Sequence, residues 1–147
     1  MALKTIDLQV PRNSIFGFLG PNGAGKTSLM KILLGFSKPT SGGGRIFGHD
    51  IQTDSVAIRE RVGYLPQHPR FMETMTAREN LRFSARFYFQ GPQSLIDARF
   101  EEMLDLVGLS SKADRPIKGF SGGEKQRLGI ALAQINAPDL LILDEPA

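Results

Sequence analysis

The stretch Gly20-Pro-Asn-Gly-Ala-Gly-Lys26-Thr27 follows the pattern GxxxxGK[ST] and decides the fold of this chain. Its glycines let the backbone turn tightly and direct N–H groups at a bound phosphate chain. The Lys26 ammonium can reach β- and γ-phosphate oxygens, and the Thr27 hydroxyl can ligate Mg²⁺. The pattern therefore predicts a phosphate-binding loop rather than an ordinary glycine-rich turn.

The residues on either side of this loop predict a strand and a helix. The apolar run Ser14–Leu19 is typical of a buried strand, and Lys26–Leu34 is typical of a helix that Gly35 ends. The loop would then lie at a helix N-terminus, where unpaired N–H groups and the helix dipole favour anions.

Length, composition and charge exclude several classes of protein. The 147 residues suit one domain with one core, and no apolar run is long enough to span a bilayer. The N-terminus lacks the pattern of a signal peptide. Without cysteine, the chain can form neither disulfides nor a thiolate metal site, which fits a cytoplasmic protein. A net charge of +3 is too mild to indicate a nucleic-acid partner.

Two further motifs carry chemistry. Asp139-Leu-Leu-Ile-Leu-Asp144-Glu145-Pro146 predicts a strand buried on both faces of a parallel sheet and ending in two carboxylates, which alone could also be a simple acidic loop. Phe120-Ser-Gly-Gly-Glu-Lys-Gln-Arg127 contains a capping box of Ser121 and Glu124 that predicts a helix start. The glycines between them are not needed for a cap, and they suit a second anion site.

Together, these motifs resemble those of the ATP-binding-cassette (ABC) ATPases. The set is GPNGAGKT, the glutamine of Tyr64-Leu-Pro-Gln-His-Pro69, FSGGEKQR and LLILDEP, in the family's order over essentially the whole chain. The SGGxxQR signature is far more specific than a phosphate loop alone, and the absence of an NKxD motif disfavours a GTPase. The resemblance implies an α/β fold of the P-loop NTPase (RecA-like) type: a parallel sheet flanked by helices, with an antiparallel β patch and a helical insertion.

The resemblance also implies roles for individual residues. Glu145 is the expected catalytic carboxylate, and the expected ligands of Mg²⁺ are Thr27, Gln67 and Asp144. The residues expected to bind ATP are Gly20, Pro21, Asn22, Gly23, Ala24, Gly25, Lys26, Thr27, Ser28 and Gln67. The residues expected to act on ATP held by a second subunit of a head-to-tail dimer are Ser121, Gly122, Gly123 and Glu124.

The segment 69–118 is predicted to be a helical subdomain. A capping box of Thr76 and Glu79 opens a helix through about Phe89, and a second helix covers Ser94–Val107. On the first helix, Arg78, Arg82 and Arg86 recur every four residues on one face. Phe83 and Phe87 form a stripe on another face. These residues either form a solvated basic face or contact a partner, and in the family this subdomain receives a coupling helix from a membrane permease.

The sequence also departs from the family's pattern. Phe120 and Glu124 replace the usual leucine and glutamine of the signature. The family's adenine-stacking aromatic, the Asp loop after DEP and a later histidine fall outside 1–147, so we expect one partial nucleotide-binding domain cut at both ends.

Three functions remain open from the sequence. The first is an ATPase subunit that energises a separate permease at the cytoplasmic face of the membrane. The stretches GFLGPNGAGKT, ILLG and PTSG resemble those of the branch that exports drugs, lantibiotics and similar compounds. The second is a soluble, non-transport ABC ATPase acting on ribosomes or DNA. The third is an inert fragment.

Overall fold

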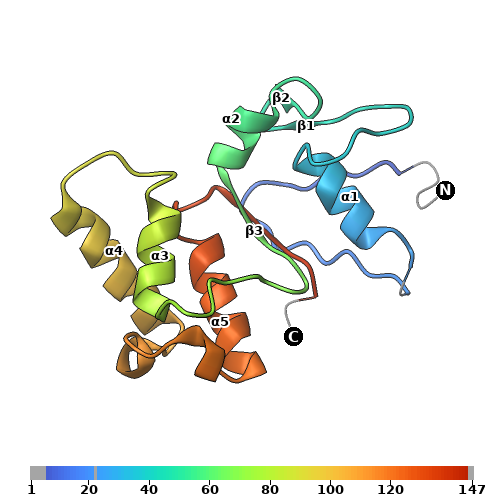
Figure 1. Ribbon diagram of the computed structural model, residues 1–147. Coiled ribbons are helices and arrows are strands. Elements are labelled where there is room, and N and C mark those ends of the chain that lie inside the picture. The colour runs from blue at the N-terminus through green and yellow to red at the C-terminus, as the bar shows by residue number, and fades with distance from the viewer. Residues whose placement is uncertain (1–5, 22, 146–147) are drawn as a thin grey trace. The chain divides into compact units, whose positions relative to one another are not determined.

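The computed structural model describes residues 6–21 and 23–145, which belong to two compact units, Met1–Ile58 and Arg59–Ala147. Figure 1 shows the helices and strands along the chain. Within the described part, no helix is both long enough and apolar enough to cross a bilayer.

The first unit carries the predicted helix after the phosphate loop and a small hairpin. Its elements are α1 (Lys26–Leu33), β1 (Arg45–Ile46) and β2 (His49–Asp50), with α2 (Ser55–Glu60) at the boundary of the unit. The predicted helix is confirmed as α1, and Gly35 follows it with a left-handed φ of 71°. The strands β1 and β2 pair antiparallel, which supplies the predicted antiparallel patch.

The predicted strand over Ser14–Leu19 is wrong. None of these residues is in a strand, and Ile15 and Leu19 are 105% and 92% exposed. A strand exists only where a neighbouring strand completes its hydrogen-bond ladder. Among the described residues of this unit, the ladder hydrogen bonds belong to β1 and β2, so this apolar run lacks a partner strand.

The second unit combines a parallel strand pair with a cluster of helices. The strand predicted after Asp139 is confirmed as β4, which pairs parallel with β3, although its residues are only half-buried because β3 lies on one side of it. The elements of this unit are β3 (Val62–Leu65), α3 (Ala77–Ala85), α4 (Gln93–Leu106), the 3₁₀ turns η1 (Ser110–Lys112) and η2 (Ile117–Gly119), α5 (Gly122–Ala133) and β4 (Leu140–Leu143).

Local sequence signals set the helix starts of this unit. Both predicted capping boxes are present, with Thr76 and Glu79 opening α3 and Ser121 and Glu124 opening α5. The helix α3 ends at Ala85, earlier than the predicted end near Phe89. Apolar side chains from α3, α4 and α5 form the core, and its fully buried members include Leu81, Phe100, Leu104, Ile117 and Leu128.

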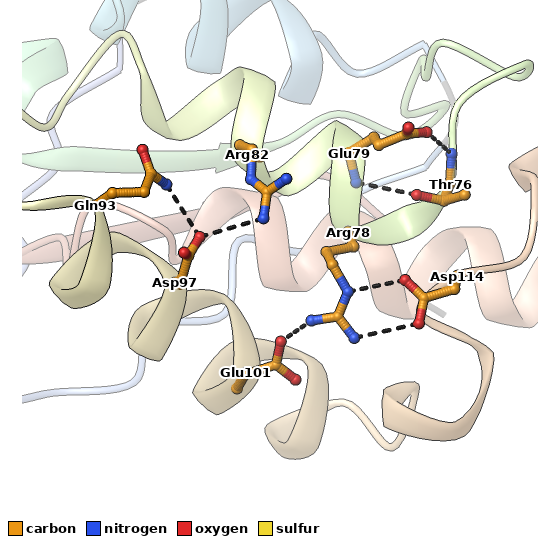
Figure 2. A network of polar contacts seen from close by, with 8 residues as sticks. All are labelled: Thr76, Arg78, Glu79, Arg82, Gln93, Asp97, Glu101 and Asp114. Carbon is orange, nitrogen blue, oxygen red and sulfur yellow. Dashed lines mark hydrogen bonds and ion pairs between the residues drawn. The ribbon is translucent and has the colours of Figure 1, made fainter.

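The arginines of α3 contact acidic side chains of the same chain (Figure 2). The Arg78 guanidinium donates to the Asp114 carboxylate at 2.9 Å and also pairs with Glu101. Arg82 donates to Asp97 at 3.3 Å from the neighbouring helix α4. The predicted basic face is therefore neither simply solvated nor reserved for a partner, since these two arginines help to join α3 to the rest of the unit. Hydrogen bonds from Arg78 hold the pKa of Asp114 below its usual value.

Gly63 shows how closely the strand β3 packs against α5. A Cβ built at Gly63 would lie 1.8 Å from the carbonyl oxygen of Ala133, a backbone atom that cannot rotate away. We expect Gly63→Ala to lower the free energy of unfolding by about 2 to 3 kcal/mol, measured by urea denaturation. Gly91→Ala is the matched control, because a Cβ at Gly91 meets no atom within 4 Å. Equal stability of the two variants would show that this contact is not close in solution.

Candidate functional site

The phosphate loop in the first unit has the backbone that its glycines predict. Gly23 and Gly25 adopt left-handed φ angles of 83° and 90°, which L side chains rarely adopt. The Ala24 N–H donates to the carbonyl of Pro21 at 3.1 Å and closes a turn. Asn22, which was predicted to contact ATP, lies outside the described residues. The loop thus has the tight curvature that a phosphate cradle requires.

Lys26 lies across the loop that it follows. Its ammonium donates to the carbonyls of Gly20 at 2.7 Å and Pro21 at 3.2 Å, so its charge is held at the loop. The first turn of α1 contains no acidic residue, and Thr27 and Ser28 both lie within it. The helix N-terminus therefore directs its positive dipole end at the loop without a competing carboxylate in its first turn.

In the second unit, Gln67 and Glu145 meet at one edge of the parallel strands. The strands β3 and β4 run in register from Val62 opposite Leu140 to Leu65 opposite Leu143, so their following residues emerge side by side. The Gln67 amide donates to a Glu145 carboxylate oxygen at 2.6 Å. Carboxyl ends of parallel strands are where α/β sheets bind ligands. The sequence predicted Glu145 at the end of a strand, and it gave Gln67 only as a ligand implied by the family resemblance.

The backbone of Glu145 is unusual. Its φ is 51°, in the left-handed region that non-glycine residues enter at a cost in free energy. Such conformations cluster at functional sites, where the surrounding structure fixes a side chain in one direction.

Asp144 is a buried carboxyl group at the same edge. Its side chain is 1% exposed, and its backbone N–H donates to the carbonyl of Leu65 at 2.9 Å. Burial, together with the negative charge of Asp144, raises the pKa of Tyr64. A buried carboxyl group is stabilised by polar or cationic neighbours, so Asp144 is suited to support a cation.

The residues predicted to bind Mg²⁺ carry oxygen donors of the chemical kind that this ion prefers. Among the described residues, no group of three histidine, cysteine or acidic side chains forms a metal cage. Mg²⁺ does not require one, because it retains several waters and binds through one or two carboxylates together with substrate phosphates. Each residue predicted to bind Mg²⁺ carries an oxygen of this kind, namely the Thr27 hydroxyl, the Gln67 amide and the Asp144 carboxyl.

The signature residues form an open helix start in the second unit. The Ser121 hydroxyl accepts the Glu124 N–H at 3.3 Å, and a Glu124 carboxylate oxygen accepts the Ser121 N–H at 2.8 Å. Gly122 and Gly123 are exposed, and a Cβ at either would meet no atom within 4 Å. Packing inside the chain therefore does not require these glycines, which leaves close approach by another molecule as a reason for them.

Sequence reasoning missed a contact at this helix start. The Lys112 ammonium pairs with the second carboxylate oxygen of Glu124, and this pairing is the largest cause that lowers the pKa of Glu124 to about 2. The carboxylate is thus ionised at neutral pH, and stability from the contact is expected above about pH 4.5 and lost as pH falls towards 2. No local pattern joins residues twelve positions apart across two turns, so the sequence offered no signal.

Comparison with known proteins gives consistent matches. Residues 3–147 match the family model described as ABC transporter. The bacitracin transport ATP-binding protein BcrA of Bacillus licheniformis is 43% identical over 96% of this chain and 45% of its own length. The daunorubicin resistance ATP-binding protein DrrA3 of Streptomyces coeruleorubidus is 37% identical over 99% of this chain and 46% of its own. The chain thus spans about half the length of these relatives.

A solved structure shares the fold. It is the structure of cbiO1 from Clostridium perfringens, described as part of the ABC transporter complex cbiONQ, and it matches with a TM-score of 0.85 and 29% identity. The match covers 97% of this chain and 58% of that one.

Proposed function

Because this chain belongs to the ABC transporter family, we propose that it binds and hydrolyses ATP as the nucleotide-binding part of a transporter. The observation that carries this proposal is the 2.6 Å contact between Gln67 and Glu145 at the shared edge of β3 and β4. It joins a carboxylate able to act on water with an amide able to respond to the γ-phosphate.

The residues of the chain divide the chemistry among them. Backbone N–H groups of the phosphate loop and the Lys26 ammonium hold the phosphates and stabilise charge that develops on them. Glu145 orients the attacking water and accepts its proton, which leaves ADP and inorganic phosphate as products. Mg²⁺, supported by Thr27, Gln67 and Asp144, would neutralise phosphate charge when bound.

A second subunit completes the site in this proposal. The open helix start offers the N–H groups of Gly122 and Gly123 and the Ser121 hydroxyl to an anion, but the chain already has the phosphate loop for its own nucleotide. A head-to-tail dimer uses both features, because each ATP then lies between the loop of one subunit and the signature of the other.

A permease is the partner that fits the exposed aromatic side chains of α3 and of the turn that follows it. Phe83 and Phe87 are 39% and 73% exposed, and their rings pack edge to face at 5.3 Å between centroids. Exposed aromatic clusters of this kind are typical of binding surfaces. The names of BcrA and DrrA3 refer to bacitracin transport and daunorubicin resistance, which favours export of an antibiotic-like compound, with the subunit held at the cytoplasmic face of the membrane.

Phe83→Asp is expected to abolish co-purification with the permease while leaving ATP binding unchanged. The carboxylate would have to lose its water in an apolar interface, and the aromatic contact with Phe87 would be lost. Leu106→Asp is the matched control, because Leu106 is 60% exposed and lies on a different helix, at the C-terminal end of α4. Retained co-purification of the Phe83 variant would contradict this docking surface and favour a non-transport ATPase.

Thermal unfolding of the purified chain with and without Mg-ATP tests the activity itself. Ligand at about 100 times its Kd stabilises a folded protein by about 2.7 kcal/mol, which would be a shift of several degrees. Release of inorganic phosphate should accompany the shift. No shift at millimolar Mg-ATP would contradict the proposal and favour a chain that does not bind nucleotide.

A further inference from the structure

The signature helix α5 carries a negative charge at the end that the proposed function assigns to an anion. The Glu124 side chain is 12% exposed and lies in the first turn, where one carboxylate oxygen accepts the Ser121 N–H at 2.8 Å. A carboxylate in this position stabilises the helix start through the capping box and the dipole. It would also repel a phosphate that approaches the N–H groups of Gly122 and Gly123 in the same turn.

Lys112 forms an ion pair with this negatively charged side chain. Its ammonium pairs with the other carboxylate oxygen of Glu124, so both oxygens are engaged. The lysine stands at the end of η1, and its backbone N–H donates to the carbonyl of Leu109 at 2.9 Å. The next residue, Ala113, accepts the Arg78 N–H at 3.0 Å, which ties the turn to α3. The lysine backbone is thus anchored beside the helix start.

The neighbouring cation does not duplicate this role. Lys125, the residue after Glu124, donates to the Glu73 carboxylate at 2.7 Å, so its charge is already balanced by another acid. In the absence of Lys112, Glu124 would therefore keep its capping contact but lose its cation.

We propose that Lys112 is a positioning residue of the signature turn, which pairs with the Glu124 carboxylate and thereby allows the N-terminus of α5 to accept the terminal phosphate of a nucleoside triphosphate held by a second subunit. The inference rests on the proposed function, because that function brings the phosphate to α5. It explains how a glutamate functions at this position, and it assigns a role to a lysine outside the signature motif.

Inorganic phosphate is the probe that tests this role without nucleotide hydrolysis. The ¹⁵N-labelled protein is titrated with phosphate at constant ionic strength, and the amide resonances of Gly122 and Gly123 report binding at α5. We expect Lys112→Met to raise the apparent Kd by about tenfold, since an unpaired carboxylate would then face the anion. Adding Glu124→Gln should restore the original Kd, because glutamine keeps the capping box without the charge.

The controls separate charge pairing from folding and from general loss of positive charge. Lys118→Met removes an exposed cation that precedes the same helix, and it should change the Kd less than twofold. Glu124→Gln alone should bind phosphate at least as well as the unmodified protein. Circular dichroism of each variant checks that the helices remain folded.

Three results would contradict the proposed role of Lys112. An unchanged Kd in Lys112→Met, a double variant that is not rescued, or no phosphate response of Gly122 and Gly123 in the unmodified protein would each reject the role of Lys112. Failure of the proposed function would be different, because ATP hydrolysis would be absent while the phosphate response of these glycines and its dependence on Lys112 persisted.

Discussion

Replacing Lys26 with alanine is expected to weaken Mg-ATP binding by at least about 100-fold, measured by calorimetry or by loss of the thermal shift. A charge-assisted hydrogen bond contributes about 1.5 to 3 kcal/mol, and the Lys26 ammonium can donate to both the β- and γ-phosphates. Each 1.4 kcal/mol is a factor of ten in affinity, so the loss of two such bonds gives this effect.

The control for this variant lies on the same helix. Lys31→Ala removes an exposed lysine from the last turn of α1, so it changes the net charge equally without approaching the phosphate loop. Lys26 also bonds to the carbonyls of Gly20 and Pro21, so the melting temperature without nucleotide shows whether the loop is disturbed. Nucleotide affinity that survives in Lys26→Ala but not in Lys31→Ala would contradict the assignment of this loop.

The parts of the fold that could be predicted are those with local causes. The capping boxes at Thr76 and Ser121 place the starts of α3 and α5, because a cap involves residues only three positions apart. Gly35 marks the end of α1 for the same reason, since only its own backbone must turn left-handed. Such signals need no knowledge of the rest of the chain.

The parts that could not be predicted depend on distant partners. The apolar run Ser14–Leu19 has the composition of a strand, but a ladder requires a second strand that periodicity cannot supply. The arginines of α3 show the same limit, because their carboxylate partners come from α4 and from the turn at Asp114. Lys112 was overlooked because only the folded turns bring it to Glu124.

The candidate site contains one feature that the sequence predicts and one that it does not. The motif predicts that Glu145 follows a strand, and the parallel register of β3 and β4 then places it beside Gln67. The left-handed backbone of Glu145 has no such signal, because glutamate does not favour that conformation. Under the proposed function, this strained backbone would hold the Glu145 side chain where it can orient the attacking water.

Glu145→Gln is the second variant with a large expected effect. The amide has nearly the shape of the carboxylate, and its oxygen can still accept the hydrogen bond from Gln67. It cannot accept a proton from the attacking water, and a general base contributes about 10²- to 10⁴-fold to the rate. We therefore expect ATP hydrolysis to fall by about 10³-fold, measured as phosphate release, while ATP affinity remains within about twofold.

The same variant tests the dimer of the proposal. If each ATP lies between the loop of one subunit and the signature of the other, blocked hydrolysis leaves nucleotide in place, and ATP-bound dimers should accumulate in size-exclusion chromatography. Glu102→Gln is the matched control, because Glu102 is an exposed acid of α4 paired with Arg99 and should leave both rate and oligomeric state unchanged. Hydrolysis at the parent rate in Glu145→Gln would remove this carboxylate from the mechanism. Blocked hydrolysis without dimers would keep its role in catalysis but reject the shared site, because only a dimer brings ATP held by one subunit to the exposed glycines of the other subunit's α5.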